Sequence, residues 1–228
     1  MMRCFASLLL LLTLSTVAQQ HSFQQASVRF LFDWPQGYPW HSYTIDVQSD
    51  GKVHFSGIPH ADETNDTDPY PIDFAMSGAN LRHAFELAQK LNYFQGDYDS
   101  HLKHIAQTGK KTLQYQSPLV HGSTSYNFSQ NADIQDLTKL FEAIAMTIDY
   151  GRKLAFQYRF DRLGMDQRMK ELVDLQASGG VQELQVIAPI LHRIADDPNV
   201  MNIARQNAQL LLHAIGQDDG TVPHPESP

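Results

Sequence analysis

The two most closely spaced histidines in the sequence are His101 and His104, three residues apart in a chain with eleven histidines. On a helix this spacing would place the two imidazoles one turn apart, and histidine is a common zinc ligand. A third ligand would have to come from Asp97, Asp99 or His121. The pair predicts a small metal-assisted hydrolase as one possible function. A histidine-rich surface without metal explains the same pattern, and we expect no bound metal or cofactor.

A second group of chemically distinctive side chains is aromatic. Trp34, Tyr38, Trp40 and Tyr43 lie close together in a segment rich in proline and glycine. Exposed tryptophan and tyrosine rings can stack on a sugar or on a side chain of a partner protein. These four residues therefore form a candidate binding site for a protein or a glycan. The alternative is that one tryptophan fills the core.

Known catalytic motifs do not support an enzyme. The sequence lacks Gly-x-Ser-x-Gly, His-Glu-x-x-His and the phosphate-binding glycine loops. Two Ser-x-x-Lys tetrads begin at Ser49 and Ser100, but neither has the companion motifs of a serine acylase. The acidic segment 62–68 lacks the spacing of a calcium loop and is expected to be a solvated loop. We assign no catalytic residue.

Charge argues against nucleic acid as a partner. The formal net charge is -8, and the basic residues are scattered among acidic ones without forming a stripe. A negative protein repels a phosphate backbone.

The first 18 residues have the pattern of a secretory signal peptide. Arg3 precedes an apolar run from Phe5 to Val17, which is shorter than the roughly 20 residues of a membrane-spanning helix. Cleavage near Ala18 would remove the only cysteine, Cys4, and leave a charge of -9, one less than -8 because Arg3 is lost. We expect a periplasmic or secreted bacterial protein with no disulfide and no stable membrane anchor.

Residues 27–152 are predicted to form an α+β domain after a flexible segment, residues 19–26. Alternating apolar residues indicate strands near 28–32, 41–47, 52–56, 72–76, 111–116 and 123–128. Asp50-Gly51 predicts a tight primed turn, with Ile45 and Val47 paired across from Phe55 and Val53. Strands followed by segregated helices favour an antiparallel sheet.

Two helices belong to this domain. The first is predicted from Ser77, which can cap it, to Phe94, and the second begins near Asp133. Gly151 is expected to break the second helix.

Residues 153–216 are predicted to form a helical C-terminal lobe. Its helices are expected over Met165–Ala177, Val181–Ala195 and Pro198–Ile215. Pro189 should kink the second or mark its start, and Asp197 suits the N-cap of the third. The polar residues 217–228 are expected to be disordered.

The segments Tyr43–Gly57 and Tyr93–Tyr98, with the helix from Ser77, resemble an uncharacterised bacterial exported domain family of unknown function. Segments 159–164 and 204–208 resemble helical C-terminal tails of acidobacterial proteins. Members of the family carry a cysteine pair where this chain has Gly37–His41, without cysteine. The resemblance implies architecture and compartment but no activity. Together these patterns favour a noncatalytic exported binding or assembly module.

Overall fold

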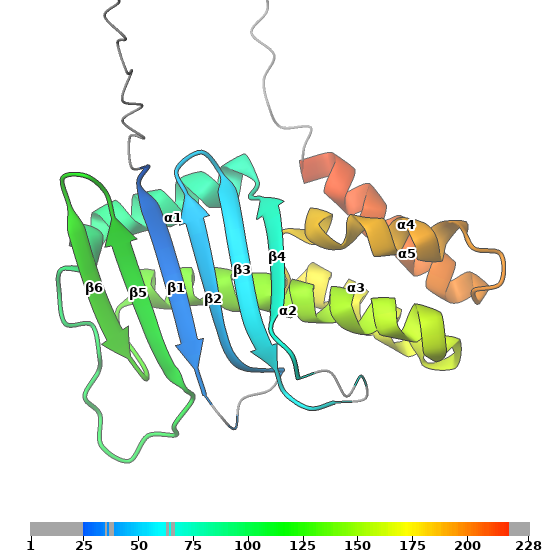
Figure 1. Ribbon diagram of the computed structural model, residues 1–228, viewed down its shortest axis with the longest axis horizontal. Helices are drawn as coiled ribbons and strands as arrows, with labels where there is room; N and C mark the ends of the chain where they lie inside the picture. The colour runs from blue at the N-terminus through cyan, green and yellow to red at the C-terminus, as the bar shows by residue number, and fades with distance from the viewer. Residues whose placement is uncertain (1–24, 35, 37–38, 63, 65–66, 219–228) are drawn as a thin grey trace, which may run out of the picture.

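The computed structural model describes residues 25–34, 36, 39–62, 64 and 67–218. The predicted signal peptide, Tyr38 and most of the predicted C-terminal tail lie outside these residues. Six strands form one antiparallel sheet in the order β4-β3-β2-β1-β5-β6 (Figure 1). The predicted α+β class is confirmed. The strands are β1 (Ser27–Asp33), β2 (Trp40–Gln48), β3 (Lys52–Pro59), β4 (Tyr70–Ala75), β5 (Lys110–Gln116) and β6 (His121–Tyr126).

The predicted hairpin between β2 and β3 is confirmed, and Val47 pairs with Val53. Its turn differs from the prediction. Three residues connect the strands, Asp50 does not take a positive φ, and only Gly51 does, at 87°. The Gly51 amide donates to the Gln48 carbonyl at 2.9 Å. A three-residue loop that ends in a left-handed glycine fits the strand twist without a primed turn.

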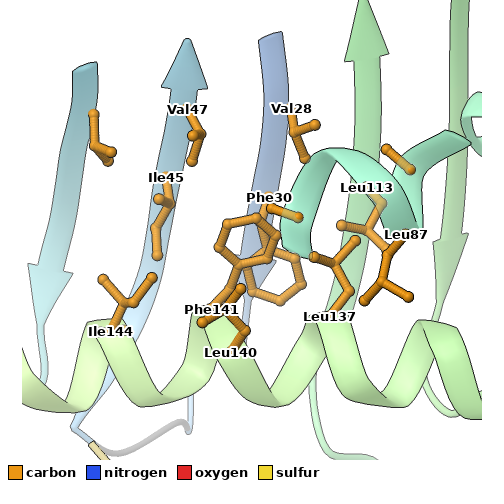
Figure 2. Packing of buried hydrophobic residues seen from close by; sticks show 14 of the residues in the cluster. Val28, Phe30, Ile45, Val47, Leu87, Leu113, Leu137, Leu140, Phe141 and Ile144 are labelled. Atoms are coloured by element: carbon orange, nitrogen blue, oxygen red, sulfur yellow. The ribbon is translucent and has the colours of Figure 1, made fainter. Parts of the chain in front are cut away.

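Helices α1 (Gly78–Lys90) and α2 (Ala132–Phe160) cover one face of the sheet (Figure 1). Ser77 caps α1 as predicted and accepts from the Asn80 amide at 3.4 Å. The helix ends earlier than expected and is followed by a short 3-10 segment, η1 (Asn92–Phe94). In the core, Phe30 of β1 stacks on Phe141 of α2 with ring centroids 5.2 Å apart (Figure 2).

The predicted break at Gly151 is wrong, because α2 is continuous over 29 residues. The boundary expected between residues 152 and 153 therefore lies inside a helix. Gly151 serves a different purpose: a β-carbon there would lie 2.3 Å from Cγ2 of Ile187. The absence of a side chain lets the 3-10 segment η3 (Leu184–Ile187) contact α2 directly.

The C-terminal lobe is helical, as predicted, and packs around a second apolar cluster that includes Leu154 of α2. Pro189 lies in the first turn of its helix and so marks a helix start. The elements are η2 (Arg162–Gly164), α3 (Met165–Ser178), η3, α4 (Ala188–Asp196) and α5 (Asn202–Asp218). In the described part of the chain, no helix has both the length and the apolarity needed to cross a bilayer.

Asp197 does not cap the last helix, which begins at Asn202. Instead Asp197 is extended, and its carboxylate accepts from the Asn199 amide at 2.9 Å in a local turn. At the other end, α5 reaches Asp218 and so includes the first two residues of the predicted disordered tail.

Glu183 joins the two parts of the molecule. The Oε2 atom accepts from the Ser77 amide at 2.8 Å, and Oε1 accepts from the Ser77 hydroxyl at 2.8 Å and from Asn80 Nδ2 at 2.7 Å. The N-terminus of a helix carries unpaired amides and a partial positive charge. A carboxylate from the C-terminal lobe thus completes the cap of α1.

The acidic loop is not solvated throughout, which corrects the prediction for residues 62–68. Asp62 is buried and forms an ion pair with Arg152 of α2. Arg152 also pairs with Asp149 at 2.9 Å and donates to the Thr64 hydroxyl at 2.6 Å. Lys153 Nζ lies 2.7 Å from Asp149 Oδ2. This buried ionic cluster, Asp62, Asp149, Arg152 and Lys153, fixes the loop to the helix.

Candidate functional site

A cavity of about 480 Å³ lies between the covered face of the sheet and α2. Trp34 follows β1, Pro39 precedes β2, Thr108 precedes β5 and Asn127 follows β6, and all four line the cavity. Because these strands are antiparallel neighbours, those four ends meet at one edge of the sheet. The volume is within the range of small-molecule sites in proteins.

Six aromatic side chains line the cavity, and three of the four predicted binding residues, Trp34, Trp40 and Tyr43, are among them. Their placement corrects the idea of an exposed aromatic surface. Trp40 is only 2% exposed, and its Nε1 donates to the Ala145 carbonyl of α2 at 3.0 Å. Tyr43 is 6% exposed and stacks on Phe32 of β1, with ring centroids 5.0 Å apart. These two rings belong to the core and face the cavity from inside.

A buried lysine belongs to the same sheet wall of the cavity. Lys111 of β5 donates from Nζ to the Thr108 carbonyl at 3.1 Å, the Thr108 hydroxyl at 3.2 Å and the Asn127 carbonyl at 3.4 Å. Burial lowers its pKa, and the nearby Glu142 opposes that shift. An ammonium has three donors. All three are directed at protein acceptors, so Lys111 is held as part of the wall.

Glu142 of α2 faces this lysine at 3.9 Å, measured from Oε1 to Nζ. Burial raises its pKa, and the charge of Lys111 partly counteracts this. At 3.9 Å the contact is an ion pair without hydrogen-bond geometry. The carboxyl group therefore retains acceptor capacity that faces the cavity.

Two tyrosine hydroxyls lie near Glu142. Tyr126 of β6 is 2.5 Å from the Thr138 hydroxyl, which itself donates to the Ile134 carbonyl at 2.6 Å. Because Thr138 uses its one proton in that bond, Tyr126 must be the donor to Thr138. Burial raises the pKa of Tyr43 well above its ordinary value, and the charges of Glu142 and Tyr126 add to the increase.

Sequence reasoning missed Lys111, Tyr126 and Glu142. One signal was available for Lys111, because it shares the strand parity of the buried Leu113 and so had to point inward. A charged residue at an inward position of a strand indicates a special environment. Nothing comparable marks Glu142, since its position depends on how α2 packs on the sheet.

The predicted histidine pair does not lie on a helix. His101 and His104 have φ values of 50° and 64° in the loop between η1 and β5. His101 Nε2 lies 2.7 Å from Asp97 Oδ2, and its other ring nitrogen is 3.6 Å from Asp99. Asp97 in particular raises the pKa of His101. Within the described ranges, no group of three or more histidine, cysteine or acidic side chains could hold a metal ion.

Comparison with known proteins adds no identity to this geometry. A scan against models of protein families finds no match, and a comparison with curated protein sequences finds none.

Proposed function

We propose that the protein is a noncatalytic binding protein whose ligand, a small and largely apolar molecule, occupies the cavity between the sheet and α2. The observation that carries this proposal is the cavity itself, about 480 Å³ in volume, with a largely apolar wall that includes six aromatic side chains. Such a site offers an apolar molecule extensive contact, and a few polar groups can orient it.

The polar groups favour binding over catalysis. A nucleophilic lysine needs a free lone pair, which requires a neutral amine. Lys111 instead directs its donors at two carbonyls and a hydroxyl, and Glu142 lies beside it. These partners favour the ammonium form and so oppose burial, which lowers the pKa of Lys111. The alternative of a metal-assisted hydrolase at His101 and His104 lacks its helical geometry.

A small ligand is also favoured over the protein or glycan partner expected from the aromatic cluster. Trp40 and Tyr43 are buried and line the cavity, so they offer no flat surface to a macromolecule. We further propose that the protein acts outside the cytoplasm, on the basis of the apolar pattern of its first 18 residues.

The test is a fluorescence titration with the neutral apolar dye N-phenyl-1-naphthylamine. Lys139 is an exposed residue of α2 at the cavity, whereas Lys170 is exposed on α3 and does not line it. Lys139→Trp introduces a large ring at the cavity, and Lys170→Trp makes the same change elsewhere. We expect the wild type and Lys170→Trp to bind one dye molecule with equal affinity, and Lys139→Trp to bind at least about fivefold more weakly, about 1 kcal/mol.

Equal dye affinity in both variants would place the dye outside the cavity and contradict the proposal. Absence of saturable dye binding to the wild type would do the same.

A further inference from the structure

We propose that the tyrosine side of the cavity recognises a hydroxyl group on an otherwise apolar ligand. This inference rests on the proposed function and names the chemical class of its ligand. Three side chains carry it: Tyr43 of β2, Tyr126 of β6 and Glu142 of α2, all of which line the cavity.

Tyr43 supplies a free donor. Its side chain is more than nine-tenths buried, and its hydroxyl makes no hydrogen bond to another residue that the structure describes. This hydroxyl is not among the described polar atoms that are fully shut off from solvent, so it is reached from the cavity. Hydroxyl groups inside folded proteins are nearly always hydrogen-bonded to protein, water or ligand, because a hydroxyl without a partner raises the free energy of the folded state. Burial also raises the pKa of Tyr43, so the hydroxyl keeps its proton. Its acceptor must therefore be a water molecule or a ligand in the cavity.

Tyr126 and Glu142 supply free acceptors. The proton of Tyr126 is committed to Thr138, which leaves a lone pair on the tyrosine oxygen. The carboxyl group of Glu142 is 3.9 Å from Lys111 and makes no hydrogen bond to another described residue. Glu142 lines the same cavity as both tyrosines, and its charge contributes to the raised pKa of each.

A single hydroxyl group complements this arrangement, since it accepts one hydrogen bond and donates another. An ether oxygen can accept from Tyr43 but has nothing to donate to Tyr126 or Glu142. A carboxylate also only accepts, and Glu142 would repel it. Lys111 cannot offset that repulsion by hydrogen bonding, because its donors are already directed at Thr108 and Asn127.

The experiment compares ligands that share one skeleton. Binding of 2-naphthol, 2-methoxynaphthalene, naphthalene and 2-naphthoate is measured by displacement of N-phenyl-1-naphthylamine. We expect 2-naphthol to bind at least about tenfold more tightly than each of the other three, as one or two well-placed hydrogen bonds allow.

Tyr43→Phe should reduce the preference for 2-naphthol over naphthalene to about twofold. Its melting temperature should stay unchanged or rise, because the hydroxyl that is removed makes no hydrogen bond to another described residue. Tyr98→Phe is the matched control, since the Tyr98 hydroxyl donates to the Leu91 carbonyl at 2.7 Å and does not line the cavity. This control should keep the preference and lose melting temperature. Glu142→Met, on a different element, should also weaken the preference.

The outcomes separate the two proposals. If the dye binds and is displaced equally well by 2-naphthol and naphthalene, hydroxyl recognition is overturned and the cavity remains a binding site. Tighter binding of 2-naphthoate would overturn it in favour of an anion. A loss of melting temperature in Tyr43→Phe as large as in Tyr98→Phe would show that the hydroxyl already has a structural partner. If no saturable dye binding occurs, the proposed function fails and this inference fails with it.

Discussion

Arg152 lies at the centre of the buried ionic cluster. Its guanidinium pairs with Asp62 and Asp149, and the three side chains are each at most 4% exposed. The guanidinium also lies 5.8 Å from the ring of Trp40, so the ionic cluster borders the wall of the cavity. Arginine suits this position because its planar fork can donate to several acceptors at once.

Arg152→Leu should therefore destabilise the protein by about 3–5 kcal/mol, because it leaves buried carboxylates without their main partner. Arg29→Leu is the control: Arg29 pairs with Asp46 on the exposed face of the sheet, and its side chain is 48% exposed. That pair should be worth less than about 1 kcal/mol. Denaturant unfolding of both variants measures the difference. Equal losses of unfolding free energy in the two variants would contradict the claim that the buried cluster contributes more to stability than the exposed pair.

Among the elements, the β2–β3 hairpin depends on one backbone conformation in its turn, because Gly51 takes a positive φ there. Gly51→Val should lower the free energy of unfolding by about 1 kcal/mol or more, because a β-branched residue is strained in that conformation. Ser49→Val, two residues earlier in the same turn and outside the left-handed region, should cost less than half as much. Chemical denaturation checks both, and a smaller loss in Gly51→Val than in Ser49→Val would contradict this account of the turn.

The strands could be predicted from the sequence because alternation is a local property. Ile45 and Val47 face the core by parity alone, and their partners follow once the turn is fixed. The continuity of α2 could not be predicted in this way. Glycine in a helix costs about 1 kcal/mol against alanine, which makes Gly151 look like a break. Gly151 contacts Ile187, which is 36 positions later in the chain, and the sequence around Gly151 gives no sign of this contact.

The candidate site could be predicted only in part, because it too depends on contacts between residues far apart in the sequence. Trp34, Trp40 and Tyr43 do line the cavity, yet the sequence could not show that Trp40 is buried. Its indole is held by a carbonyl of Ala145, 105 residues away. The pairing of Lys111 with Glu142 depends likewise on the packing of α2 against β5. Residue types that suit a binding site can be recognised in a sequence, but the residues that they contact in the folded protein cannot.

At the scale of the whole molecule, α2 contributes to both apolar clusters, and Glu183 adds a polar link between the lobes through Ser77. Glu183→Ala should reduce stability by about 1–3 kcal/mol, since it removes charge-assisted bonds to Ser77 and Asn80. Glu86→Ala, on the exposed side of α1, should cost less than about 0.5 kcal/mol.

Hydrogen exchange gives this variant a specific signature. The Ser77 amide, which donates to Glu183, should exchange faster in Glu183→Ala, whereas it should be unaffected in Glu86→Ala. Unchanged exchange at Ser77 would contradict a role for Glu183 in capping α1.

The Glu183 cap also orders events during synthesis. Ser77 is synthesised 106 residues before Glu183, which completes the cap of its helix. Asp62 is synthesised 90 residues before its ion-pair partner Arg152. Domains generally begin to fold from the N-terminus as the chain emerges. Here a nascent chain that ends before residue 183 has every strand of the sheet but an open first turn on α1. The sheet can form early in translation, but the cap of α1 is completed only after the start of the C-terminal lobe, including Glu183, has been synthesised.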